Sequence, residues 1–191
     1  MVISMRDSMK QNTGYQLGNM LLMHFFAALV AFTFGTVAFW WFLGEHIWKE
    51  LFSIIFIIVY AVILYLRAKK FGNLDAKPYT PMKPRILKGV LFGVCISLTV
   101  LLAFVIMRLV WAYAESNYLL MTTGNFIFTF WTFPYYGILG LNEGRVMSYA
   151  FVIMIVLPVL MCSVGYIMGC KNKNLSYKLR DMMYEEEDNE E

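Results

Sequence analysis

Side chains that could perform acid–base or metal chemistry are scarce in the apolar parts of this sequence. The chain has two histidines, His24 and His46, and only His24 lies within a long apolar run. An imidazole in such surroundings could take up a proton or bind a ligand, or it could be held by a hydrogen bond to a neighbouring helix. His24 is therefore a candidate polar site, and the structural role is the favoured alternative.

A second candidate site is formed by Arg108 and Glu115, which follow the third apolar run. The two side chains could bind a ligand together, or Arg108 could extend its head group to the lipid–water boundary. No Asp or Glu lies in the core of any apolar run, which argues against proton- or sodium-coupled transport. Catalytic and metal-binding motifs are absent as well. We expect no enzyme activity, no cofactor and no nucleic-acid partner.

The apolar composition indicates the class of protein. Of the 191 residues, 60% are hydrophobic and 15% are charged, whereas soluble domains are roughly 45–50% apolar. The apolar residues fall into four runs that are long enough to cross a hydrocarbon layer of ~30 Å as helices. The predicted spans cover residues 20–43, 48–66, 88–110 and 146–169. The sequence thus predicts a single all-α membrane domain over residues 1–191, surrounded by a lipid bilayer.

The distribution of positive charge predicts the orientation of the spans. Most of the 16 Lys and Arg residues lie before the first span, in a basic, Pro-rich loop at residues 67–88, and in the tail at residues 171–191, which ends in a run of acids. The opposite side holds Lys49, Arg145 and Arg108. Cytoplasmic segments carry the excess of Lys and Arg. We therefore expect a multi-pass protein of the plasma membrane with both termini in the cytoplasm.

An uncharged segment at residues 118–141 separates the third and fourth spans. A fifth span here would place one of the basic segments outside, and the segment contains several helix breakers and turn formers. We expect an outer interfacial or re-entrant element whose aromatic side chains keep their polar atoms in water. Its candidate interface residues are Trp131, Pro134, Tyr135 and Tyr136.

Small residues at helical spacing provide surfaces for close helix packing. The predicted packing residues are Ala27, Ala31 and Gly35 in the first span, Gly89 and Gly93 in the third, and Gly165 and Gly169 in the fourth, with a further pair, Gly14 and Gly18, before the first. The third and fourth spans are consecutive, which makes them antiparallel neighbours, and their glycine pairs fall at nearly the same depth. We predict that these two pairs face each other at a close crossing; the alternative is that one pair faces outward and builds an oligomer.

Several features of the chain resemble those of a wider group of proteins. They are Asp75, the Pro-rich basic loop, the Gly89/Gly93 pair and the closing sequence Gly-Tyr-Ile-Met-Gly-Cys-Lys-Asn-Lys-Asn-Leu-Ser that begins at Gly165. In these features the chain resembles small four-span membrane proteins of unknown function from Gram-positive gut bacteria. The resemblance implies a bacterial plasma membrane and no assigned activity.

The sequence offers many small residues for helix packing and few reactive groups. This combination favours a protein that acts by contact with other protein chains. The leading hypothesis is a non-enzymatic membrane protein that acts as an oligomer or as an accessory subunit of a larger membrane complex. The alternatives are a channel or small-solute transporter without acid coupling, and a membrane sensor or immunity-type regulator. A continuous polar stripe through the bundle would favour the channel, whereas an apolar interior would favour the contact role.

Overall fold

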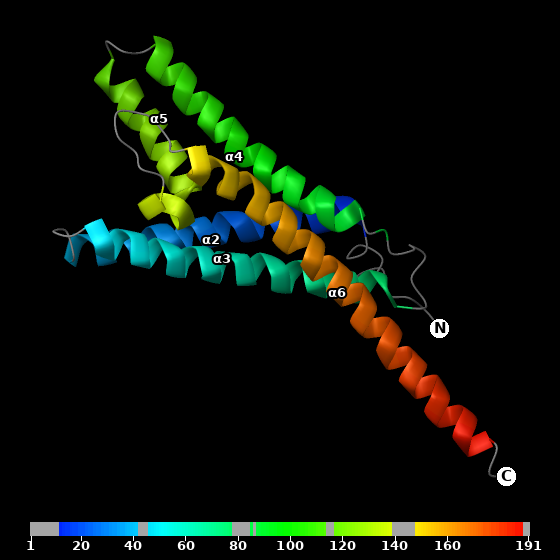
Figure 1. Cartoon of the computed structure of the whole chain (residues 1–191). Helices are drawn as coiled ribbons and strands as arrows, with labels where there is room; N and C mark the ends of the chain where they lie inside the picture. The colour runs from blue at the N-terminus through cyan, green and yellow to red at the C-terminus, as the bar shows by residue number, and fades with distance from the viewer. Residues whose placement is uncertain are drawn as a thin grey trace.

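The computed structural model describes residues 12–41, 46–77, 85, 87–113, 117–138 and 148–188. Every regular element within these ranges is helical. The elements are α2 (Thr13–Trp41), α3 (His46–Asp75), α4 (Leu87–Tyr113), α5 (Tyr118–Trp131), the 3₁₀ helix η1 (Phe133–Ile138) and α6 (Ser148–Asp188) (Figure 1). Glu115, the prolines of the basic loop and the side chains of the tail beyond Lys171 lie outside the described residues.

Four of these helices are long and apolar enough to cross a membrane. Among the described residues, the candidate spans are Thr13–Val37, Leu51–Asp75, Leu87–Tyr113 and Tyr149–Lys171. Each has 23 to 27 residues, which at ~1.5 Å per residue exceeds a hydrocarbon layer of ~30 Å. The prediction of an all-helical chain with four candidate membrane-spanning helices is confirmed, and these four helices indicate an integral membrane protein.

Three helices extend clearly beyond the spans that the sequence predicts. α2 begins at Thr13 instead of residue 20, α3 continues to Asp75 instead of ending at residue 66, and α6 continues to Asp188 instead of residue 169. The basic residues that follow residue 66 are good helix formers, and Gly72 is held against the backbone of α6. Hydropathy reveals the apolar part of a helix but not its hydrophilic continuation. The predicted loop at residues 67–88 is therefore shorter than expected.

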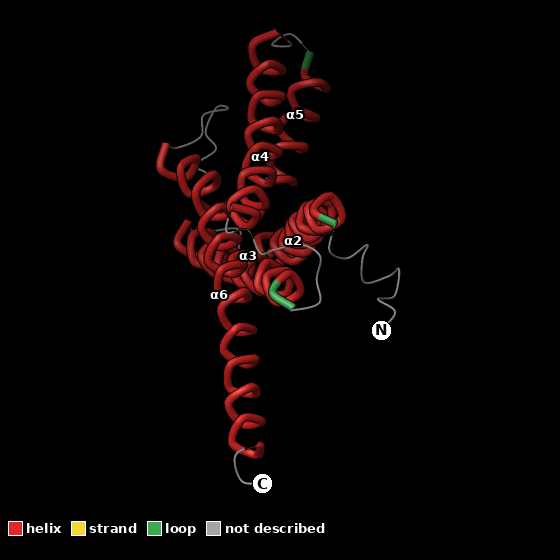
Figure 2. Tube along the Cα trace, turned by 90° about the vertical axis from the view of Figure 1, so that its right-hand side faces the viewer, coloured by secondary structure: helices red, strands yellow, loops and turns green. Residues whose placement is uncertain are grey.

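The helix α6 is central to the bundle because it packs against both α3 and α4. The helix α5 returns along α4 and forms a helical hairpin with it (Figure 1). The 3₁₀ helix η1 contacts α3 and α2. At the end where α4 meets α5, this hairpin stands apart from the α2–α3 pair, as Figures 1 and 2 both show.

The core of the bundle combines aliphatic and aromatic side chains. Met20, Leu64 and Phe92 are fully buried, and the ring of Phe92 makes edge-to-face contacts with Phe71 and Tyr166. The outward faces of the same helices carry exposed Leu, Ile, Val and Phe side chains. Lipid rather than water must solvate this surface, because an apolar surface of this extent is uncommon on soluble proteins.

Candidate functional site

The carboxylate of Asp75 makes the largest number of interactions between helices among the described polar groups. Its Oδ2 accepts hydrogen bonds from Lys88 Nζ at 2.6 Å and from the Tyr166 hydroxyl at 2.8 Å, and its Oδ1 accepts one from Gln16 Nε2 at 2.9 Å. Asp75 is 2% exposed and Lys88 is 9% exposed. These four residues, here called the Asp75 cluster, join α3, α4, α6 and α2 at one end of the bundle.

Asp75 and Lys88 form an ion pair, although each charge is unfavourable at its own helix terminus. Asp75 lies at the C-terminus of α3, where the helix dipole is negative, and Lys88 lies at the N-terminus of α4, where the dipole is positive. Pairing the two side chains offsets both effects. A buried charge that loses its partner costs about 3–5 kcal/mol. The pair therefore favours the arrangement in which the end of α3 lies beside the start of α4.

A second group of buried polar residues lies deeper in the bundle. The Nδ1 of His24 is 2.7 Å from the hydroxyl of Tyr60 on α3. The ring of His24 also packs edge-on against Trp131, with 5.1 Å between the ring centres. Tyr60 packs edge-on against Tyr135, with 5.7 Å between the ring centres. We call these four residues the His24 layer. The Nε2 of His24 is buried and has no hydrogen-bond partner among the described residues.

An apolar layer separates the two polar groups. On α2, Met20 lies between Gln16 of the Asp75 cluster and His24, which are eight residues or ~12 Å apart. Leu64 on α3 and Phe92 on α4 are also fully buried, as Met20 is. The polar side chains of the described interior therefore do not form a continuous stripe through the bundle.

In the segment between α4 and α6, the end of α5 and the 3₁₀ helix η1 pack inside the bundle, whereas the start of α5 is exposed. The Trp111 indole N–H donates to Asn125 at 2.8 Å, and the Trp131 indole N–H donates to Thr99 at 3.2 Å, so α5 lies along α4 over its length. After α5 the chain turns into η1, where the hydroxyl of Ser53 donates to the carbonyl oxygen of Pro134 at 3.3 Å.

The expectation that the aromatic residues of this segment keep their polar atoms in water is wrong for Tyr135 and Trp131. Tyr135 is fully buried in the His24 layer, and the indole N–H of Trp131 is used inside the bundle. Pro134 is buried as well, and Tyr136, stacked on Phe133, is half-buried. The space between α2 and α3 accepts these rings, and for Trp131 a hydrogen bond to Thr99 replaces one to water. The buried hydroxyl of Tyr135 has no hydrogen-bond partner among the described residues.

The glycine pairs take part in close packing, but not in the predicted combination. Added Cβ atoms on Gly89 and Gly93 of α4 would come within 3 Å of α6, at Tyr166 and at the carbonyl oxygen of Pro158. By contrast, Gly165 and Gly169 of α6 lie against the backbone of α3. The prediction that the two pairs face each other is therefore wrong. α6 uses one face for α4 and a different face for α3.

The remaining predicted packing residues lie on α2. Gly35 lies against the ring of Phe133 in η1, while Ala27 and Ala31 are buried and line a groove beside α3. Gly18 has open space around it, since a Cβ added there would meet nothing within 4 Å. The Gly14/Gly18 pair is therefore not covered by the described part of the chain.

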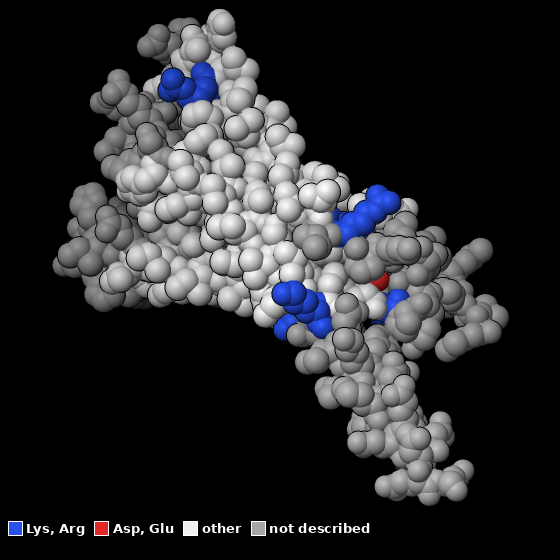
Figure 3. Space-filling view, turned by 45° about the vertical axis from the view of Figure 1, so that its right-hand side comes forward, with Lys and Arg blue, Asp and Glu red and all other residues white. Residues whose placement is uncertain are grey.

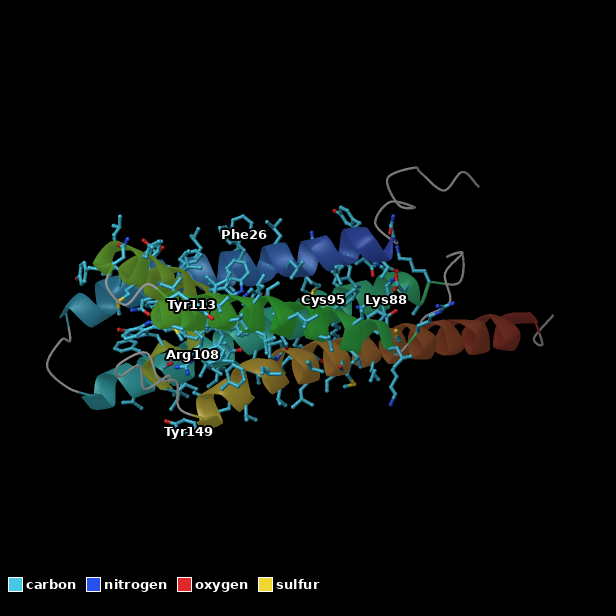
Figure 4. The ribbon with its side chains drawn as sticks, turned by 90° about the horizontal axis from the view of Figure 1, so that it is seen from above. Phe26, Lys88, Cys95, Arg108, Tyr113 and Tyr149 are labelled. Carbon is cyan, nitrogen blue, oxygen red and sulfur yellow. The ribbon has the colours of Figure 1, made fainter. Side chains whose placement is uncertain are left out.

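Arg108 lies at the end of α4 opposite Lys88 (Figure 4). The two residues are separated by 20 positions, or ~30 Å of helix. Arg108 is exposed, whereas its proposed partner Glu115 lies outside the described residues. The described part of the chain contains no group of three or more His, Cys, Asp or Glu side chains that could hold a metal ion.

Comparisons with known proteins found no matching family model, no matching curated protein and no matching solved structure. The site is therefore interpreted from its own geometry.

Proposed function

We propose that this chain is a non-enzymatic integral membrane protein that acts by contact, either as an oligomer or as an accessory subunit of a larger membrane complex. The proposal places the protein in the plasma membrane, with the Asp75 end and both termini on the cytoplasmic side. The excess of Lys and Arg at that end supports this orientation. In this orientation α5 and η1 form an element that enters from the outer side and returns to it.

The single observation that carries the contact role is the exposed tip of the α4–α5 hairpin. Tyr113 is 86% exposed, Tyr118 is 83% exposed and Leu119 is 75% exposed. From Lys88 to Tyr113 the helix rises ~38 Å, which is more than the ~30 Å hydrocarbon layer. The tip therefore extends past the layer and presents apolar side chains outside it. Exposed apolar patches of this kind are typical of protein–protein interaction sites.

The arrangement of the interior also supports contact over conduction. The layer of Met20, Leu64 and Phe92 interrupts the polar residues within the bundle. The glycines on α4 and α6 are already used within the chain, which leaves the hairpin tip and the open Gly14/Gly18 pair as contact surfaces.

A small-solute transporter without acid coupling is the second candidate. It is favoured by the buried Nε2 of His24, which has no partner among the described residues and could bind a polar group in another conformation. The apolar layer between the polar groups would then have to open during transport.

The contact role predicts that the protein is larger than a monomer when it is extracted gently. In nanodiscs cut directly from the membrane, we expect a particle whose protein mass exceeds the 22.2 kDa of one chain. The variant Leu119→Ser should lower this mass and leave the unfolding temperature unchanged. A matched control is Leu87→Ser, since Leu87 is a similarly exposed leucine at the opposite end of α4. A strict monomer without a partner would refute the proposal and leave the transporter as the better candidate.

A further inference from the structure

A groove of about 320 Å³ lies between α3 and α6. One stripe of α3, from Ile57 to Tyr65, forms one wall, and Leu157 and Met161 of α6 form the other. No polar surface is exposed in the groove. Its chemistry therefore fits a hydrocarbon chain.

The groove ends where the two helices come into backbone contact. Gly165 lies against the backbone of Tyr65, and Gly169 lies against the backbone of Lys69. In these two contacts the residue numbers increase along both helices, so α3 and α6 run in the same direction. The walls close at this crossing, and any occupant that continues past it must pass over the surface of the two helices.

Lysines follow the groove on both helices. Lys69 comes one helical turn after Tyr65, and its Nζ lies 5.8 Å from the centre of the Tyr65 ring. Lys171 on α6 and Lys70 on α3 are exposed at the same end. Figure 3 shows Lys and Arg gathered there beside a broad surface without charge.

The acid nearest to these lysines in the described part of α3 does not neutralise them. Asp75 is buried, and its carboxylate is paired with Lys88 and bonded to Tyr166. This carboxylate is therefore engaged within the Asp75 cluster and is not available to the lysines at the end of the groove.

We propose that this groove binds an anionic phospholipid of the surrounding bilayer. One acyl chain lies between Ile57 and Met161, and the phosphate lies at Lys69 and Lys171. Each Lys near a membrane surface contributes about 1 kcal/mol to attraction of anionic lipid. A second copy of this chain is a poorer occupant, because in the same orientation it would bring its own lysines to the same level.

The second groove of the bundle provides a comparison within the molecule. It lies between α2 and α3, measures about 220 Å³ and is lined by apolar side chains and the ring of Tyr60. The cation nearest along α3 is Arg67, whose Nε donates to Asn19 at 2.6 Å and whose guanidinium lies over Phe71. Its guanidinium already donates to Asn19, and it is one cation against the three lysines at the end of the α3–α6 groove, which is therefore the better site for a phosphate.

The experiment measures the association of spin-labelled phosphatidylglycerol relative to spin-labelled phosphatidylcholine with the full chain in vesicles of phosphatidylcholine. We expect the wild-type protein to prefer phosphatidylglycerol. Lys69→Gln and Lys171→Gln should each lower that preference by about fivefold. The control Arg108→Gln removes an exposed cation at the opposite end of the bundle from these lysines. It should leave the preference for phosphatidylglycerol unchanged. Ile58→Trp fills the groove from its exposed wall and should lower the preference with both lysines in place.

Equal association of the two lipids with the wild-type protein would overturn the proposal, as would an unchanged preference in both lysine variants. Displacement of the lipid by inorganic phosphate would show an ion site that does not need the groove, and would also overturn it. If Ile58→Trp instead abolishes a dimer of the wild-type chain, then a second copy and not a lipid occupies the groove. Unfolding temperatures measured in parallel should be unchanged in all four variants.

Discussion

The two interior polar groups differ in how completely their hydrogen-bonding capacity is used. The carboxylate of Asp75 accepts bonds from three side chains, and these come from three other helices. His24 uses one ring nitrogen with Tyr60, while the other has no partner among the described residues. Polar groups away from water must be satisfied within the protein. The Asp75 cluster therefore acts as a structural connection, and His24 retains capacity for a further interaction.

At the residue scale, Lys88→Met should destabilise the protein by about 3–5 kcal/mol, because it leaves the buried carboxylate of Asp75 without its cation. The double variant Asp75→Leu/Lys88→Met should cost less than Lys88→Met alone, since it removes both charges. The measurement is the free energy of unfolding in detergent for each variant. A double variant that is less stable than the single variant would contradict the assignment of Asp75 and Lys88 as one buried pair.

At the scale of elements, α6 determines how the other helices are placed. Its small residues allow two backbones to approach, with Gly165 and Gly169 against α3 and the Cys162–Tyr166 face against Gly89 of α4. Helices in lipid associate through such close packing and through hydrogen bonds, because no hydrophobic effect drives them together. The α3–α6 crossing is thus a main source of stability for the bundle.

Gly165→Leu should disrupt this crossing. The added side chain would meet the backbone of Tyr65, which cannot move aside without separating the two helices. We expect a loss of about 3 kcal/mol in the free energy of unfolding, the upper part of the usual range for overpacking.

The matched control is Gly18→Leu, which introduces the same side chain where a Cβ would meet nothing within 4 Å. Its free energy of unfolding should be close to that of the wild-type protein. If the two variants are equally stable, the α3–α6 crossing does not exist in the membrane.

At the scale of the whole molecule, the two ends of the bundle have opposite character. One end gathers most of the described lysines and arginines around the buried Asp75 cluster, and the other presents the apolar tip of the α4–α5 hairpin with Arg108 beside it (Figures 3 and 4). A membrane protein inserts with its basic end in the cytoplasm. The orientation proposed above follows from this asymmetry.

Cysteine labelling tests that orientation. In a chain whose Cys95, Cys162 and Cys170 are replaced by alanine, Arg85→Cys should react with a membrane-impermeant reagent only after the cells are opened. Tyr118→Cys should react in intact cells. Both positions are exposed in the structure, so access depends on the side of the membrane and not on burial. The reverse pattern would show that the chain is inserted the other way around.

The sequence by itself determined the number and type of the long helices. Whether a segment of 20 or so apolar residues prefers lipid is a property of that segment alone, and hydropathy measures it directly. The sequence also indicated most of the glycines that lie in close contacts, because a residue without a side chain on an apolar helix permits such approach. It was wrong for Gly18, which has open space around it, and it missed Gly72. The sequence did not indicate which helix each glycine contacts. The predicted pairing of α4 with α6 through both glycine pairs was wrong.

The tertiary structure alone decided which distant residues meet. Gln16, Asp75, Lys88 and Tyr166 come together from four helices, although the sequence pattern places Asp75 and Lys88 in a basic loop. Asp75 is the one acid of residues 67–88, a signal that could have marked it. The burial of Tyr135 likewise depends on the space that α2 and α3 leave for η1. Such features arise from the relative rotation and depth of helices, which periodicity within any one helix does not contain.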